Sequence, residues 1–197
     1  MTRMPTVHFV THPEVSIDPT VPVPEWGLSA VGLARARLLA GLPWVAAVRL
    51  VASSAERKAI ETARALALGC GGVPTVDPAL GENDRSATGY LPRAEFEEVA
   101  DAFFAHPEQS VRGWERAVDA QRRIVGAVEG LLRTASGDGD IAVCSHGAVG
   151  ALLLCHLLGV PISRTLDQPG SGGNVFTFDA RTRRVLTRWR PLEDTGG

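Results

Sequence analysis

The chain has 197 residues, of which 45% are hydrophobic and 21% charged, and its formal net charge is −2. This length and apolar content fit one domain with a buried core, and the near-neutral charge predicts neither nucleic acid nor a membrane surface as a partner. No apolar run is long enough to span a bilayer and the first residues lack a signal-peptide pattern, so we expect a cytoplasmic protein. The three cysteines have no metal-site or redox spacing.

Strand and helix patterns alternate along the chain. This alternation predicts an α/β fold: a three-layer α/β/α sandwich with a mostly parallel central sheet and helices on both faces. We expect strands at residues 6–12, 47–53, 73–76, 141–146, 175–179 and 185–189. We expect helices at residues 29–40, 55–68, 92–105, 114–134 and 148–158. Nothing in the composition divides the chain, so residues 1–197 should form a single domain.

Two histidines stand at the carboxyl ends of predicted buried strands. His12 ends the first strand and His146 ends the strand at 141–146. Ligands of open α/β sheets bind at that edge, so we expect both imidazoles at one reaction centre. Taken alone, a histidine such as His12 at the end of a strand is more often a hydrogen-bonded structural group than a catalytic one. Glu82, in a polar loop, is a candidate proton donor, and together the three also make a two-histidine, one-carboxylate metal set.

A basic segment follows the second predicted strand. Ser53 and Glu56 have capping-box spacing, which indicates that a helix begins here. Arg57 and Lys58 then lie in its first turn, where cations oppose the helix macrodipole unless an anion binds there. The alternative for Arg57 is an exposed i,i+4 ion pair with Glu61.

A glycine follows the second histidine. Gly147 allows a bound group to approach the backbone closely, and free N–H groups of the following helical turn can hold phosphate oxygens. The alternative is an ordinary capping turn in which His146 is a bystander.

In this order, the motifs resemble those of the histidine phosphatase superfamily, which has the phosphoglycerate-mutase-like fold. The matching segments are Thr11-His12-Pro13-Glu14, Leu28-Ser29-Ala30-Val31-Gly32, residues 53–63, Leu80-Gly81-Glu82, Ser145-His146-Gly147 and Asn174-Val175-Phe176. The resemblance implies a phosphatase in which His12 becomes phosphohistidine, Glu82 protonates the leaving oxygen and His146 holds the phosphoryl oxygens. It implies a small phosphorylated substrate or a phosphoprotein, with no cofactor and no metal.

The sequence departs from that family in the phosphate pocket. Thr11 and Lys58 stand where the family has arginines, and Pro13 replaces a glycine. Lysine lacks the bidentate fork of arginine, so we expect an altered phosphate site, with Arg85 swinging in to compensate. The expected phosphate-binding residues are Thr11, Lys58, Arg57, Arg85 and Gly147. The alternatives are a weak or inactive relative that binds an anionic ligand, and the metal site.

Overall fold

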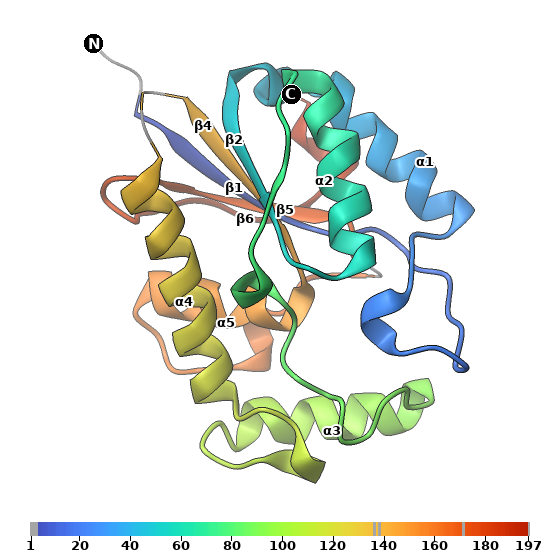
Figure 1. The fold of residues 1–197 in the computed structure, drawn as a ribbon. Helices are drawn as coiled ribbons and strands as arrows, with labels where there is room; N and C mark the ends of the chain where they lie inside the picture. The colour runs from blue at the N-terminus through green and yellow to red at the C-terminus, as the bar shows by residue number, and fades with distance from the viewer. Residues whose placement is uncertain (1–3, 136, 138, 171, 197) are drawn as a thin grey trace.

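The computed structural model describes residues 4–135, 137, 139–170 and 172–196, and within them six strands form one sheet in the order β3-β2-β4-β1-β5-β6 (Figure 1). The strands are β1 (Thr6–Thr11), β2 (Val48–Ser53), β3 (Thr75–Val76), β4 (Asp140–Ser145), β5 (Asn174–Asp179) and β6 (Val185–Pro191). The first four run parallel, and β5 and β6 are antiparallel to their neighbours. The prediction of a mostly parallel sheet is confirmed.

Helices cover both faces of this sheet. They are α1 (Ala30–Leu38), α2 (Arg57–Cys70), α3 (Arg93–Ala105), α4 (Ala117–Thr134) and α5 (Gly147–Leu158). Figure 1 shows α1 and α2 on one face, α4 and α5 on the other, and α3 apart from both layers. The structure therefore confirms the α/β/α sandwich.

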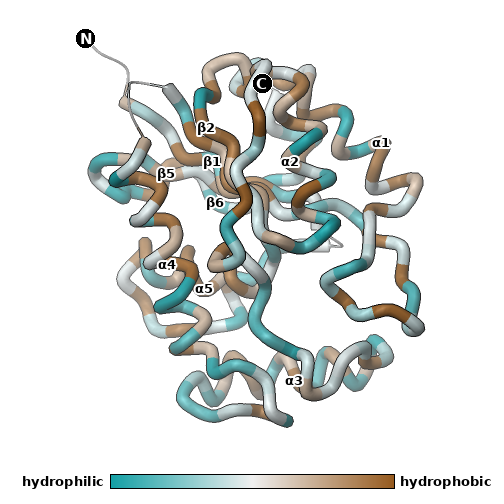
Figure 2. The backbone as a smooth tube through the Cα atoms, in the orientation of Figure 1, coloured by the Kyte–Doolittle hydropathy of each residue, from teal (hydrophilic) through white to brown (hydrophobic). Residues whose placement is uncertain are grey.

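Alternate side chains of the central strands point into two separate cores. In β1, Phe9 packs in the core on the α4 and α5 side, whereas Val10 packs against α2. In β4, Val143 and Cys144 divide in the same way. Figure 2 shows these strands as a hydrophobic centre. These strands are therefore buried on both faces, as is typical of a parallel sheet covered by helices.

The second helix differs from its expected bounds at both ends. It ends two residues beyond Leu68, at Cys70, because Gly71 is the residue that adopts the left-handed conformation, with φ +70°. At its start the capping box is absent: Glu56 is the N-cap residue without a side-chain cap, and Ser53 Oγ is buried without a partner. The N-cap residue of α1 is Ser29, whose Oγ accepts the Gly32 N–H at 3.0 Å.

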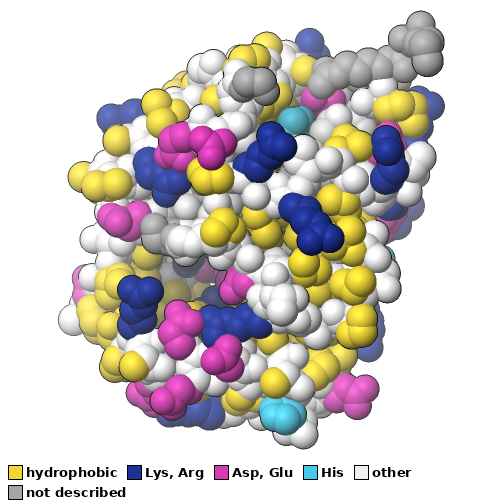
Figure 3. Space-filling model, turned by 180° about the vertical axis from the view of Figure 1, so that it is seen from behind, with side chains coloured by type: hydrophobic (Ala, Val, Ile, Leu, Met, Phe, Trp, Pro, Cys, Tyr) yellow, Lys and Arg dark blue, Asp and Glu magenta, His cyan; other side chains and the backbone are white. Residues whose placement is uncertain are grey.

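The surface carries charges of both signs. On the face drawn in Figure 3, acidic and basic side chains are interspersed. Within the described part of the chain, no helix is both long enough and apolar enough to cross a membrane.

Candidate active site

The two histidines predicted to converge lie next to each other. The ring centroids of His12 and His146 are 5.2 Å apart, with the rings inclined at 65°. This contact follows from the pairing of β1 with β4, where Thr11 lies opposite Ser145 and the His12 N–H donates to Ser145 O at 3.2 Å. The sheet edge thus brings two distant parts of the chain to one point.

One tautomer of His12 is favoured by its backbone contact. Nδ1 lies 2.8 Å from Pro13 O, and because a carbonyl can only accept, Nδ1 carries the proton. Nε2 therefore keeps its lone pair. Burial lowers the pKa of His12 to about 4, so the ring is neutral near pH 7. A neutral imidazole with a free Nε2 is chemically a nucleophile.

His146 has one satisfied ring nitrogen and one orphan. Its Nε2 lies 2.7 Å from Ser54 Oγ and 3.2 Å from Glu56 Oε1, whereas its Nδ1 is buried without a partner. Burial lowers the pKa of His146 to about 4, although the Glu56 carboxylate opposes this shift. A buried orphan nitrogen costs free energy, which a ligand that pairs with it recovers.

Glu56 is a site residue that the sequence interpretation missed. Its Oε2 accepts a hydrogen bond from Lys58 Nζ at 2.5 Å and its Oε1 accepts one from the Glu82 N–H at 2.9 Å. Burial alone would raise the pKa of Glu56, but the charges of His146 and Lys58 and these hydrogen bonds lower it to about 2. The spacing from Ser53 suggested a capping role, whereas the carboxylate turns inward to Lys58 and the His146 ring.

Glu82 lies at the N-terminus of α5. Its Oε1 accepts from the Val149 and Asn83 N–H groups, both at 3.1 Å, and its Oε2 accepts from the Ala148 N–H at 3.3 Å. Arg85 completes the set with an ion pair of 2.9 Å to Oε2. The carboxyl group is thereby held beside the two histidines, with four donors directed at it.

Arg85 also packs on aromatic rings. Its guanidinium carbon lies 5.0 Å from the Phe96 ring centroid and 5.3 Å from that of Trp114. Such cation–π contacts hold a guanidinium without using its N–H donors. Arg85 therefore keeps N–H groups for an anion while its plane stays packed.

The loop that carries Glu82 is anchored from α4. Arg123 donates to the carbonyl oxygens of Ala79, Gly81 and Glu82 at 2.8 to 3.0 Å, and it also pairs with Glu115. Three backbone contacts from one side chain restrict the movement of this loop.

Two adjoining hollows, of about 340 and 610 Å³, lie around these groups. Both are lined by His12, Glu82, Asn83 and Arg85. The smaller one is also lined by Gly147, Gln168 and residues of α3, and the larger one by Glu56, Lys58 and His146. Six of the eight residues proposed from the sequence thus lie around one space: His12, Glu82, His146, Lys58, Arg85 and Gly147.

The other two proposed residues lie outside this space. The Arg57 side chain is 65% exposed and pairs with Glu61 at 2.9 Å, so the i,i+4 alternative describes it and the expected phosphate contact does not. Arg57 points away because it lies about 100° around the helix from Lys58. Thr11 is fully buried, and its hydroxyl donates to Gln168 Oε1 at 2.6 Å instead of facing the hollow.

Asn83 is a second residue that the sequence interpretation missed. It is only 3% exposed, and both its Oδ1 and its Nδ2 are buried without a partner, yet it lines both hollows. Buried amides are normally paired, so an orphan of this kind indicates a ligand. Its position next to Glu82 was the only signal in the sequence.

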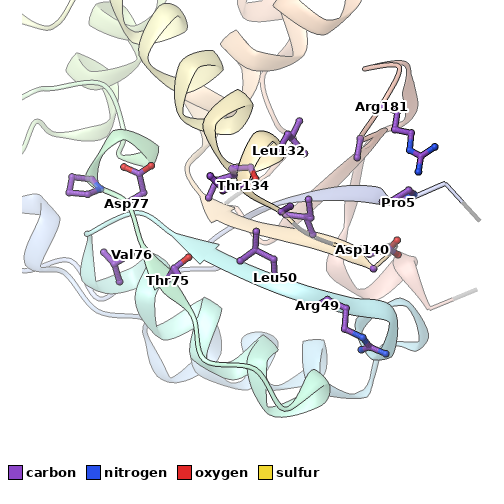
Figure 4. A pocket seen from close by; sticks show the side chains of 17 residues that line it. Pro5, Arg49, Leu50, Thr75, Val76, Asp77, Leu132, Thr134, Asp140 and Arg181 are labelled. Carbon is purple, nitrogen blue, oxygen red and sulfur yellow. Dashed lines mark hydrogen bonds between the residues drawn. The ribbon is translucent and has the colours of Figure 1, made fainter.

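A separate cavity of about 700 Å³ lies beside α4, against β2 and β3 (Figure 4). Its lining contains Leu50, Val76 and Leu132, with Arg49 and Arg181 on one side. It contains none of the eight candidate residues. Among the described residues, no group of three or more His, Cys, Asp or Glu side chains has an arrangement that could hold a metal ion.

Comparison with known proteins places this geometry in context. The sequence model of the histidine phosphatase superfamily (branch 1) matches residues 20–190. Among solved structures, the fold is similar to a mycobacterial glucosyl-3-phosphoglycerate phosphatase (TM-score 0.75, 21% identity, 94% of this chain and 96% of that one). It is also similar to Bacillus stearothermophilus YhfR (TM-score 0.74, 20% identity, 92% and 94% of the two chains). No curated protein matches the sequence.

Proposed function

This chain belongs to branch 1 of the histidine phosphatase superfamily, and from that membership we propose that it hydrolyses phosphomonoesters through a phosphohistidine on His12. Phosphatase-type activity is supported by the family and by the phosphatase among its structural neighbours. The observation that carries the specific proposal is the neutral His12 ring with a free Nε2 in a hollow shared with Glu82.

In the first step, His12 Nε2 attacks phosphorus. A P–N bond forms as the P–O ester bond breaks, and the leaving oxygen takes a proton from Glu82, whose carboxylate takes up that proton from the arriving ester monoanion as Arg85 moves to the phosphoryl oxygens. The charge that develops on the equatorial oxygens requires donors fixed in advance. Lys58 and Arg85 are placed to supply them, and the orphan Nδ1 of His146 supplies a third once the incoming anion has brought a proton to that nitrogen.

In the second step, water replaces the alcohol. Glu82, now ionised, takes a proton from the water, whose oxygen attacks phosphorus and breaks the P–N bond. Inorganic phosphate leaves and His12 returns to its neutral form. The sum is hydrolysis of one ester by one water, so neither cofactor nor metal is required.

A second candidate function is anion binding with weak or no turnover. It is favoured by one observation: each of the two cations that line the larger hollow is already paired with a carboxylate, Lys58 with Glu56 and Arg85 with Glu82. A phosphoryl group must compete with these carboxylates, because every exchanged contact loses an ion pair. Measured turnover separates the two candidates.

The test is hydrolysis of p-nitrophenyl phosphate by the wild type, His12→Asn and His106→Asn. We expect His12→Asn to lose activity by more than about a thousandfold, because removing a nucleophile abolishes the covalent path. His106 is exposed and lines neither hollow, so its variant should retain full activity. Rapid quenching of the wild type should trap a phosphoenzyme that acid cleaves and alkali spares, as expected for a P–N bond.

Two results would contradict the phosphatase proposal. One is turnover that survives in His12→Asn. The other is a wild type that binds vanadate yet hydrolyses no phosphomonoester, which would support the second candidate. Vanadate suits this purpose because the mycobacterial phosphatase has been solved both with inorganic phosphate and with VO3.

The substrate belongs to this proposal only as a class: a small phosphorylated metabolite or a phosphoprotein. A cytoplasmic location is also part of the proposal, since the cysteines Cys70, Cys144 and Cys155 are free, as is typical of a reducing compartment.

A further inference from the structure

Gln168 lies beside the nucleophile, although nothing in the sequence motifs indicates it. It follows a short 3-10 helix, Arg164–Leu166, and lines the smaller hollow together with His12 and Gly147. Its Nε2 would lie 2.4 Å from a Cβ placed on Gly147 and 3.9 Å from one placed on Gly172, and the latter Cβ would lie 2.4 Å from His12 O. The amide nitrogen is therefore lodged between the start of α5 and the backbone of the nucleophile.

The orientation of this amide is set by a chain of hydrogen bonds. The Asn174 N–H donates to Thr11 Oγ1 at 3.0 Å, and that hydroxyl donates to Gln168 Oε1 at 2.6 Å. Asn174 Nδ2 also donates to the same Oε1, at 3.1 Å. A flipped amide would direct its own N–H groups at these donors. Oε1 must therefore face Thr11 and Asn174, which leaves Nε2 free to donate elsewhere.

The contact with Gln168 shows what the threonine at position 11 does. The Thr11 side chain is fully buried and too short to reach the hollow, and the Gln168 amide continues in the direction in which it points. The two residues together extend from β1 to the hollow, as one long side chain at position 11 would. Their end is a neutral N–H donor in place of a cation.

Resting on the proposed phosphatase, we propose that Gln168 binds the phosphoryl group by donating from Nε2 to an oxygen, and that Thr11 is the positioning residue that aims it. A neutral donor suits a site whose cations are already paired, because it has no counter-ion to release when the anion arrives. It acts on the oxygens both in the bound ester and in the transition state.

The experiment measures vanadate affinity and p-nitrophenyl phosphate turnover in Gln168→Leu, Gln168→Glu, Thr11→Val and Thr11→Ser. We expect Gln168→Leu to lose about tenfold to a hundredfold in vanadate affinity and in turnover. This loss is at or below the effect of removing one donor from an oxyanion hole. Gln168→Glu should lose more, because its carboxylate repels the anion. Thr11→Val should also lower vanadate affinity and turnover, because it removes the hydroxyl that orients Gln168. Thr11→Ser keeps that hydroxyl and should retain the wild-type values.

A matched control is Gln109→Leu, which removes an exposed carboxamide away from the hollow and should change neither quantity. Wild-type vanadate affinity in Gln168→Leu, or equal losses in the Leu and Glu variants, would overturn the assignment of Gln168 while leaving an active phosphatase intact.

If Thr11→Val fails to fold, the two Gln168 variants decide the matter alone. A wild type that binds vanadate without turnover would defeat the phosphatase proposal, and the affinities would still test Gln168. A wild type that does not bind vanadate would overturn both.

Discussion

Lys58 Nζ lies 2.5 Å from Glu56 Oε2, so the buried cation of the candidate phosphate pocket is neutralised before any ligand arrives. The same carboxylate lies 3.2 Å from His146 Nε2 through its other oxygen. With its pKa lowered to about 2, Glu56 remains charged at every ordinary pH. The pocket thus holds a fixed negative charge where an incoming phosphoryl group needs positive charge.

Replacing Glu56 by glutamine should therefore strengthen anion binding. The variant keeps an oxygen that accepts the Glu82 N–H but removes the charge. A unit charge about 6–8 Å from the anion is worth roughly thirtyfold to a hundredfold in affinity at an effective dielectric constant of about 20. Vanadate titration measures the change. The matched control is Glu61→Gln, since Glu61 pairs with the exposed Arg57 and should leave affinity unchanged. A weaker affinity in Glu56→Gln would instead show that the carboxylate serves mainly to hold Lys58 in place.

Arg85 and Lys58 should contribute about equally to anion binding. Both line the larger hollow, and each is paired with a carboxylate, so removing either should weaken vanadate binding by a similar factor, roughly tenfold to a hundredfold for one charge-assisted contact. Arg57→Ala is the control: it is the neighbour of Lys58 in sequence, but it faces solvent and should bind vanadate as the wild type does. An unchanged affinity in Arg85→Ala would remove Arg85 from the site.

The histidines predict that the protein loses stability in mild acid. Burial lowers the pKa of both His12 and His146 to about 4, from 6.5. Between those values the unfolded chain binds more protons than the folded one, so the free energy of unfolding falls as pH falls from 6.5 towards 4, by a few kcal/mol for each ring at about 1.4 kcal/mol per pKa unit. Above pH 6.5 both rings are neutral in either state and this contribution is constant.

Urea unfolding at pH 7 and pH 5 measures this loss. The His12→Gln variant removes one of the two shifted groups, so its stability should fall less than that of the wild type between the same two values. Equal stability of the wild type at both pH values would show that at least one ring takes up its proton in the folded state without penalty.

Patterns along the chain were sufficient to predict the sheet and its two histidines. Apolar runs define β1 and β4, and the rule that parallel strands end at one edge brings His12 next to His146. The same patterns misplaced Arg57 and Thr11, because the direction of a side chain around a helix start or a strand end depends on one or two residues of register. Glu56 illustrates the point: its spacing from Ser53 suggested a cap, and the structure turns it inward.

Asn83 and Gln168 could not be found from local patterns at all. Gln168 is placed by hydrogen bonds to Thr11 and Asn174, which are contacts between segments distant in the sequence. The Asn83 amide is buried without a hydrogen-bond partner. Only the folded structure shows this, because burial and pairing both depend on the surrounding chain. Both belong to tertiary structure, where sequence spacing carries no information about them.

Replacing Asn83 should raise the stability of the protein and lower its activity. The Asn83 amide is 3% exposed with neither polar atom paired, and each unsatisfied group of this kind costs about 1–3 kcal/mol. Asn83→Leu replaces the amide with an apolar side chain of similar size, so we expect the free energy of unfolding to rise by about 1–2 kcal/mol. Because the amide lines both hollows beside Glu82, kcat/KM for p-nitrophenyl phosphate should fall in the same variant. Urea denaturation with an unchanged slope and steady-state kinetics measure the two effects, and Asn174→Leu is the matched comparison.

The Asn174 amide donates to both Gln168 and Pro169, so its removal should lower stability. A loss of stability in Asn83→Leu as large as that in Asn174→Leu would mean that the Asn83 amide is satisfied in the folded protein and does not await a ligand.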